Sequence, residues 1–228
     1  MANELLFFIT VVINFICIIG MYKFLGKTGL YIWVAFATVL ANIEVTKNVD
    51  MFYMSVTLGN VLYGTISLAT DILNENYGKQ SAKKAVTIGF VIMLIFTVLT
   101  QIALLFAPNS YDFVNDSFKV IFELSPRIFF GSLIAYAISN NLNVIIFDRL
   151  KTKMPADKYF WIRNNVSTML SQFIDTCIFT LIAFTFVFEF KYVVILIFTT
   201  YVVKVGIAIM DTPFLYLAKK IKKHVKEI

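Results

Sequence analysis

Seven long apolar runs dominate this sequence, and they restrict its fold more than any other feature. A helix needs roughly 20 mainly apolar residues to cross a hydrocarbon core of about 30 Å, and each run approaches that length. The runs cover approximately residues 5–22, 29–45, 54–74, 85–107, 127–147, 166–188 and 192–217. With 59% hydrophobic and only 15% charged residues, the chain lacks the polar surface of a solvated globule. The sequence therefore predicts an all-α, polytopic transmembrane helix bundle. Residues 1–228 are expected to form a single transmembrane domain, with a basic tail at 218–228.

The basic residues between the runs predict the orientation of the chain. Fifteen Lys and Arg residues lie in one alternating set of flanking segments, whereas the other set holds three, Lys47, Lys119 and Lys191. Cytoplasmic flanks of membrane proteins carry the excess of Lys and Arg. We therefore expect the C-terminus in the cytoplasm. The net charge of +6 follows from this asymmetry, and no basic soluble face interleaved with aromatic residues favours a nucleic-acid partner.

Ionisable side chains inside the apolar runs or at their ends are the strongest functional signal, because such groups are costly at bilayer depth and typically functional. They comprise Glu44, Asp71, Glu75, Arg127, Asp175, Lys204 and Asp211, with Asn42, Asn164 and Gln172 among the neutral polar residues beside them. Helical spacing groups six of these residues on three helix faces, Asp71 with Glu75, Gln172 with Asp175, and Lys204 with Asp211. Polar faces at overlapping depth predict one internal cavity.

The carboxylates among these groups outnumber the cations by five to two. Ion pairs such as Asp175 with Lys204, or Glu44 with Arg127, would explain any one residue as a packing device. They do not explain the set, because a sealed network in lipid cannot hold the uncompensated negative charges. The surplus carboxylates must be protonated, open to water, or bound to a ligand rich in N–H donors. A planar, guanine-like base fits the last case, since carboxylate and amide oxygens accept its hydrogen bonds.

Four blocks of residues carry a resemblance to a known family. They are residues 71–78, residues 127–136, residues 161–176, and Tyr201 with Lys204. In these blocks, which occur in order, the chain resembles the queuosine precursor transporter family of vitamin-uptake-type membrane proteins. The match runs from about Val34 to Leu217. The run at 5–22 precedes it and departs from the usual six helices, so six to seven spans are expected. Whether this run packs at the periphery or touches a partner is left open.

The resemblance implies an importer of queuosine precursors, 7-deazaguanine bases in the cyano or aminomethyl form, across a bacterial inner membrane. It also implies an S-component-like fold, related to the substrate-binding subunits of energy-coupling-factor transporters. Carried over position by position, it implies a set of substrate-binding residues: Asp71, Glu75, Arg127, Gln172, Asp175, Lys204, Asn42 and Asn164. Either Glu75 or Asp211 is a candidate for carrying a coupling proton, since burial raises a carboxyl pKa toward neutrality.

Two other functions stay open. One is the substrate-binding subunit of an ATP-driven vitamin or nucleobase uptake complex, with Ala37 and Ala41 as a docking face for its ATPase. The other is a retinal-type seven-helix photoreceptor, suggested by Lys204 in the last run, although Thr200 stands where a carboxylate is expected. An enzyme is not expected, because no histidine lies within the runs to activate a nucleophile.

No cofactor and no metal are expected. The only histidine, His224, lies in the basic tail, and Cys17 and Cys177 lie inside apolar runs. The expected partners are a small nucleobase-like substrate and the lipid bilayer. A homo-oligomer and an ATPase partner are left open.

Overall fold

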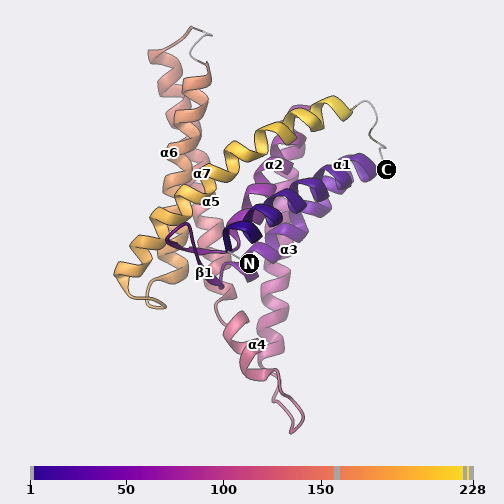
Figure 1. Cartoon of the computed structure of the whole chain (residues 1–228), viewed down its shortest axis with the longest axis vertical. Coiled ribbons are helices and arrows are strands. Elements are labelled where there is room, and N and C mark those ends of the chain that lie inside the picture. Colours follow the sequence, from indigo (N-terminus) through magenta and orange to yellow (C-terminus); the bar gives the residue numbers. More distant parts are fainter. Residues whose placement is uncertain (1–2, 157–159, 223–224, 226–228) are drawn as a thin grey trace. The chain divides into compact units, whose positions relative to one another are not determined.

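The computed structural model describes residues 3–156, 160–222 and 225. Its elements, in chain order (Figure 1), are α1 (Asn3–Glu44), β1 (Asn48–Met51), β2 (Met54–Thr57), α2 (Asn60–Tyr77), α3 (Lys79–Leu104), α4 (Asn115–Phe122), α5 (Ser125–Lys153), α6 (Phe160–Phe184) and α7 (Phe190–Ile221). Five helical segments in the described residues are long and apolar enough to cross a membrane. The predicted fold class, all-α and polytopic, is confirmed.

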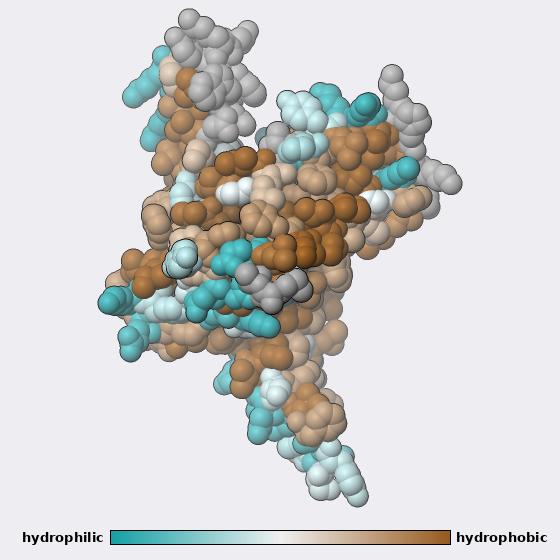
Figure 2. Space-filling model, viewed as in Figure 1, coloured by the Kyte–Doolittle hydropathy of each residue, from teal (hydrophilic) through white to brown (hydrophobic). Residues whose placement is uncertain are grey.

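The chain divides into two units. Unit 1 contains Met1–Ser125 and Val202–Ile228, and unit 2 contains Pro126–Tyr201, so that α7 contributes to both. In unit 1, helices α1, α2 and α3 pack against one another (Figure 1). Large apolar side chains such as Ile16, Phe36 and Leu99 remain exposed, and Figure 2 shows apolar side chains over much of the visible face. Such a surface suits contact with lipid rather than water.

Helix α1 is bent at Gly26, where it passes between the first two predicted runs. Gly26 has φ 56° and ψ −138°, a conformation that residues with a Cβ avoid. Before the bend, Val11, Phe15, Ile18 and Tyr22 form a fully buried stripe in the core of unit 1. The N-terminal run, whose place the sequence left open, is therefore an integral part of this unit.

A short hairpin, β1–β2, precedes α2. Its two-residue turn consists of Phe52 and Tyr53, both at positive φ, which is the geometry of a type I′ turn. Residues 54–57 were predicted to begin the third helical run, but they form strand β2. Pairing with β1 explains the difference, because Val56 lies opposite Val49 in the antiparallel ladder and is fully buried in the unit 1 core.

Small residues on α1 and α2 lie against other parts of unit 1. Gly64 on α2 lies against Ile207 on α7, where an added Cβ would meet the Ile207 Cγ2 at 2.2 Å. On α1, Ala37 and Ala41 are buried in the unit 1 core. The small-residue face considered as an ATPase dock is thus occupied within the chain.

Candidate functional site

Asp175 on α6 is the most deeply buried of the predicted site carboxylates that the structure describes, with only 5% of its surface exposed. The Ser139 hydroxyl on α5 donates a hydrogen bond to its Oδ1 at 3.2 Å. The same hydroxyl lies 3.3 Å from the Tyr136 carbonyl oxygen. A buried carboxylate beside a neutral donor is an acceptor held in a defined place.

Asp175 lies among other polar groups of unit 2. Gln172, half-buried, precedes it by three residues on α6 and so lies on a neighbouring part of the same face. Buried hydroxyls occur on all the helices of this unit, at Ser132, Ser139, Ser167, Ser171, Thr176, Thr180, Thr199 and Thr200. The Tyr201 ring stacks edge-on against Phe173, with centroids 5.3 Å apart. Unit 2 thus combines an acid, an amide and hydroxyls.

Arg127, at the start of α5, binds the C-terminal end of α6. Its Nη2 donates to the carbonyl oxygens of Ile182 at 3.0 Å and Thr185 at 2.5 Å. The last carbonyls of a helix have no partner within the helix, and a cation there also complements the helix dipole. These contacts account for Arg127 structurally, and its predicted role in substrate binding stays a prediction.

Lys204 in unit 1 faces an aromatic ring. Its Nζ lies 4.9 Å from the centroid of Tyr63 on α2, within the range of a cation–π interaction. The close contact between Gly64 and Ile207 brings α2 and α7 together one turn away. The predicted ion pair of Lys204 with Asp175 joins residues of different units and stays a prediction.

Two more of the predicted acids lie near each other in unit 1. Asp71 on α2 and Asp211 on α7 interact electrostatically. Asp71 is exposed and Asp211 is half-buried. The sequence paired Asp71 with Glu75 and Asp211 with Lys204 by helical spacing, and it could not predict the approach of acids from two helices.

Glu75, one residue beyond the predicted third run, forms an ion pair with Lys219. Their Oε1 and Nζ atoms lie 2.6 Å apart, and the two side chains are 50% and 63% exposed. Lys219 lowers the pKa of Glu75 through this hydrogen bond and its charge. From the sequence, Lys219 belongs only to the basic tail, and the 144 residues between the partners hide their pairing.

The remaining predicted residues have less distinctive surroundings. Asn42 is buried, and its Nδ2 donates to the Thr38 carbonyl oxygen at 2.6 Å, one turn earlier in α1. Glu44 is half-buried at the end of α1. The side chain of Asn164 lies outside the described residues. Within the described part of the chain, no group of three His, Cys, Asp or Glu residues could hold a metal ion.

The sequence is similar to those of proteins described as transporters. A family described as "Putative vitamin uptake transporter" matches residues 57–218. A "Probable queuosine precursor transporter" from Bacillus subtilis (strain 168) is 40% identical over 220 residues, 96% of each chain. A protein of the same name from Haemophilus influenzae is 29% identical over 130 residues, covering 56% of this chain and 52% of that protein. No solved structure matches.

Proposed function

Because this chain belongs to the vitamin uptake transporter family, we propose that it imports a queuosine precursor across a bacterial inner membrane. The substrate is a 7-deazaguanine base in its cyano or aminomethyl form. The similarity to the Bacillus subtilis protein over nearly the full length of both chains supports this substrate class. The observation that carries the proposal is Asp175, a carboxylate buried inside a membrane protein next to the neutral Ser139 hydroxyl.

Asp175 suits the edge of a guanine-like base. The ring N–H and the exocyclic amine of such a base point the same way, and the two oxygens of one carboxylate accept both hydrogen bonds. Gln172, on the same helix, offers an amide that donates to the carbonyl oxygen of the base. Hydrogen bonds to a charged acceptor in a buried place are worth more than those to a neutral one, so Asp175 contributes most of the specificity.

Lys204 and Tyr63 form a second group that we assign to transport. The Tyr63 ring offers a face for stacking, and the Lys204 ammonium lying 4.9 Å from its centroid offers a donor. Their assignment rests on contacts within unit 1 alone, and the Lys204→Met variant tests it separately from Asp175.

Proton coupling is proposed for the pair of acids, Asp71 and Asp211. Their electrostatic interaction across α2 and α7 supports this role, because a shared proton relieves like-charge repulsion. Glu75 is the other residue that the sequence suggested, and its ion pair with Lys219 argues for Asp211 instead. Uptake by wild-type protein that persists unchanged when the proton gradient is collapsed would exclude the coupling.

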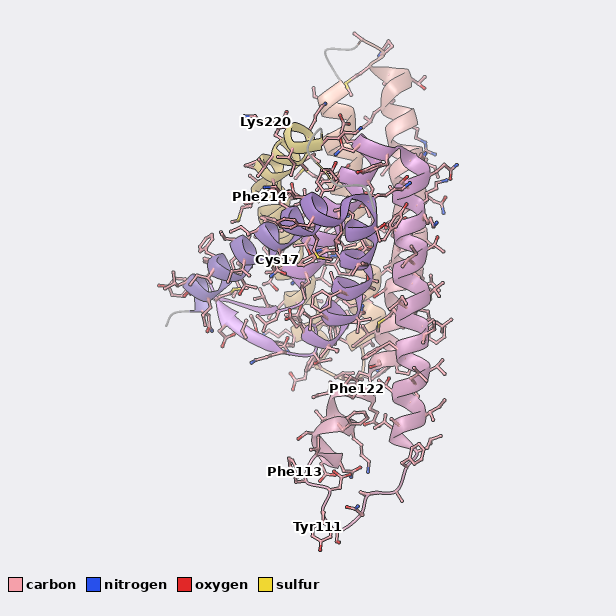
Figure 3. The ribbon with its side chains drawn as sticks, turned by 90° about the vertical axis from the view of Figure 1, so that its right-hand side faces the viewer. Cys17, Tyr111, Phe113, Phe122, Phe214 and Lys220 are labelled. Carbon is pink, nitrogen blue, oxygen red and sulfur yellow. The ribbon has the colours of Figure 1, made fainter. Side chains whose placement is uncertain are left out.

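The proposed topology has the lysine-rich end of unit 1 in the cytoplasm. Figure 3 shows Lys220 and Tyr111 toward opposite ends of this unit. Lys220 belongs to the basic tail, and Tyr111 lies in the segment between α3 and α4, which the charge bias puts outside. Cysteine labelling at these two positions from either side of the membrane tests the orientation.

The function is tested in cells that cannot make queuosine precursors and are fed the base. We expect wild-type protein to restore queuosine in tRNA, and Asp175→Asn to lower the initial rate of uptake about 10- to 100-fold, the loss expected for a hydrogen bond to a charged group. Asp116→Asn makes the same change on exposed α4 and should leave uptake unchanged. With equal expression, wild-type rates for Asp175→Asn would contradict the assignment of this residue, and no uptake by the wild-type protein would contradict the function.

A further inference from the structure

Lysine ammonium groups and tyrosine rings gather at one end of unit 1. We call this the basic–aromatic cluster, which consists of Lys27, Tyr31, Tyr77, Lys84 and Lys222. Its members come from the start of the second half of α1, the end of α2, the start of α3, and the residue that follows α7. Four separate segments therefore supply one cluster.

The ammonium groups alternate with the rings. The Lys27 Nζ lies 5.8 Å from the Tyr31 centroid and 5.6 Å from the Tyr77 centroid. The Lys84 Nζ lies 5.8 Å from the Tyr31 centroid, and the Lys222 Nζ lies 5.7 Å from the Tyr77 centroid. Lys27 thus shares a ring with each of the other two lysines, so that each of the two rings has two positive charges beside it.

Among the residues that the structure describes, carboxylates compensate this charge only in part. Glu75, the nearby acid, forms its ion pair with Lys219, at 2.6 Å, and also interacts electrostatically with Lys222. The Lys222 ammonium donates to the backbone oxygen of Asn76, also at 2.6 Å. Neither Lys27 nor Lys84 has a carboxylate at ion-pair distance in the described ranges. The cluster is therefore built to favour an anion from outside the chain.

The Tyr31 hydroxyl gives an independent indication of the same ligand. It is buried, and within the described part of the chain it has no hydrogen-bond partner. Leaving a buried hydroxyl unsatisfied is costly, so such groups normally have a partner. The ring that carries this hydroxyl lies near the ammonium groups of Lys27 and Lys84, and an oxyanion is an acceptor that suits the hydroxyl and both ammonium groups.

We propose that the basic–aromatic cluster binds the phosphate of an anionic phospholipid. The phosphate oxygens accept from Lys27 and Lys84 and, with a small rotation of its side chain, from Tyr31. The location favours lipid, because tyrosine rings and lysine stems are suited to the membrane interface, and basic pockets between helices bind anionic headgroups there. Figure 2 shows hydrophilic side chains beside apolar ones at this end of unit 1.

The test is a lipid titration of the full-length protein in detergent, followed by native mass spectrometry. The probes are dioleoylphosphatidylglycerol and, as the neutral comparison, dioleoylphosphatidylcholine. The variant Lys27→Gln/Lys84→Gln should bind phosphatidylglycerol about 25-fold more weakly than wild type, at about fivefold for each lysine. The control Lys79→Gln/Lys83→Gln removes two exposed lysines of α3 that lie outside the cluster, and it should bind like wild type. Tyr31→Phe should weaken binding by a smaller factor.

Competition with inorganic phosphate distinguishes the two sources of the anion. Phosphatidylglycerol binding that resists millimolar phosphate identifies the lipid headgroup as the ligand, as proposed. Displacement by phosphate, with no preference for phosphatidylglycerol over phosphatidylcholine, would assign the cluster to a soluble phosphate and overturn the lipid proposal. Equal losses in the cluster variant and its control, or wild-type binding by a cluster variant with an unchanged melting temperature, would overturn the site itself.

Discussion

At the scale of residues, the charged groups within the predicted spans divide into different kinds. Asp175 is buried next to a neutral hydroxyl and Lys204 faces an aromatic ring. Arg127 instead binds helix carbonyls, and Glu75 is joined to Lys219. The excess of acidic over basic residues describes the charged residues of the spans together. The role of each residue depends on which side chain or backbone group it contacts in the fold.

Arg127→Gln tests whether this side chain serves the fold. Removing two hydrogen bonds to the end of α6 should lower the free energy of unfolding by about 1.5–3 kcal/mol, which thermal unfolding in detergent measures. Arg149→Gln, an exposed position on the same helix, should have little effect. Substrate binding lost without any change in melting temperature would show that Arg127 acts on the substrate instead.

The Glu75–Lys219 ion pair predicts a specific dependence on pH. Because Lys219 lowers the pKa of Glu75 below its ordinary value of 4.5, ionised Glu75 stabilises the folded state above that pH. The contribution is lost as the pH falls through the lowered value. Glu75→Gln should therefore lower the melting temperature slightly at pH 7 and not at acidic pH, where both proteins carry a neutral side chain. A difference that grows on acidification would be inconsistent with this ion pair.

At the scale of elements, close helix contacts determine which polar groups can meet. The contact of Gly64 with Ile207 holds α2 against α7, and the same two helices carry Tyr63 with Lys204 and Asp71 with Asp211. The helices themselves were predictable from apolar runs of the correct length. Their partners were not, because periodicity reveals which face of a helix is polar but not which helix it meets. Ser139 was missed for this reason, since only the fold brings its hydroxyl to Asp175.

Gly64→Ala should push α2 and α7 apart, since the new Cβ would lie 2.2 Å from the Ile207 Cγ2. Overpacking of this kind costs about 1–3 kcal/mol, and uptake should fall with the melting temperature. Ile207→Ala in the same protein should recover part of both. Gly206→Ala is the matched control, because no atom lies within 4 Å of its added Cβ. Equal effects of the two glycine substitutions on uptake and melting temperature would contradict the close contact of Gly64 with Ile207.

At the scale of the whole molecule, the class of protein was predictable from the sequence, whereas parts of its local structure were not. The all-α, membrane-spanning character follows from composition and from the length of the runs, and the family resemblance from four spaced blocks is confirmed by the family match and by the Bacillus subtilis relative. The hairpin at residues 48–57 escaped prediction because Met54 and Val56 continue an apolar pattern that helix and strand share. The sequence could predict acids at membrane depth, but not the hydroxyls and lysines that contact them.

The central claim is that Asp175 reads the donor edge of a guanine-like base, and binding to purified protein tests it most directly. The Kd of 7-cyano-7-deazaguanine is compared with that of the analogue lacking the exocyclic amine, for wild type and Asp175→Asn. If the amine donates to Asp175, its removal should weaken binding to wild type about 10- to 100-fold and have little effect on the variant. The same loss in both proteins, or none in wild type, would contradict the claim.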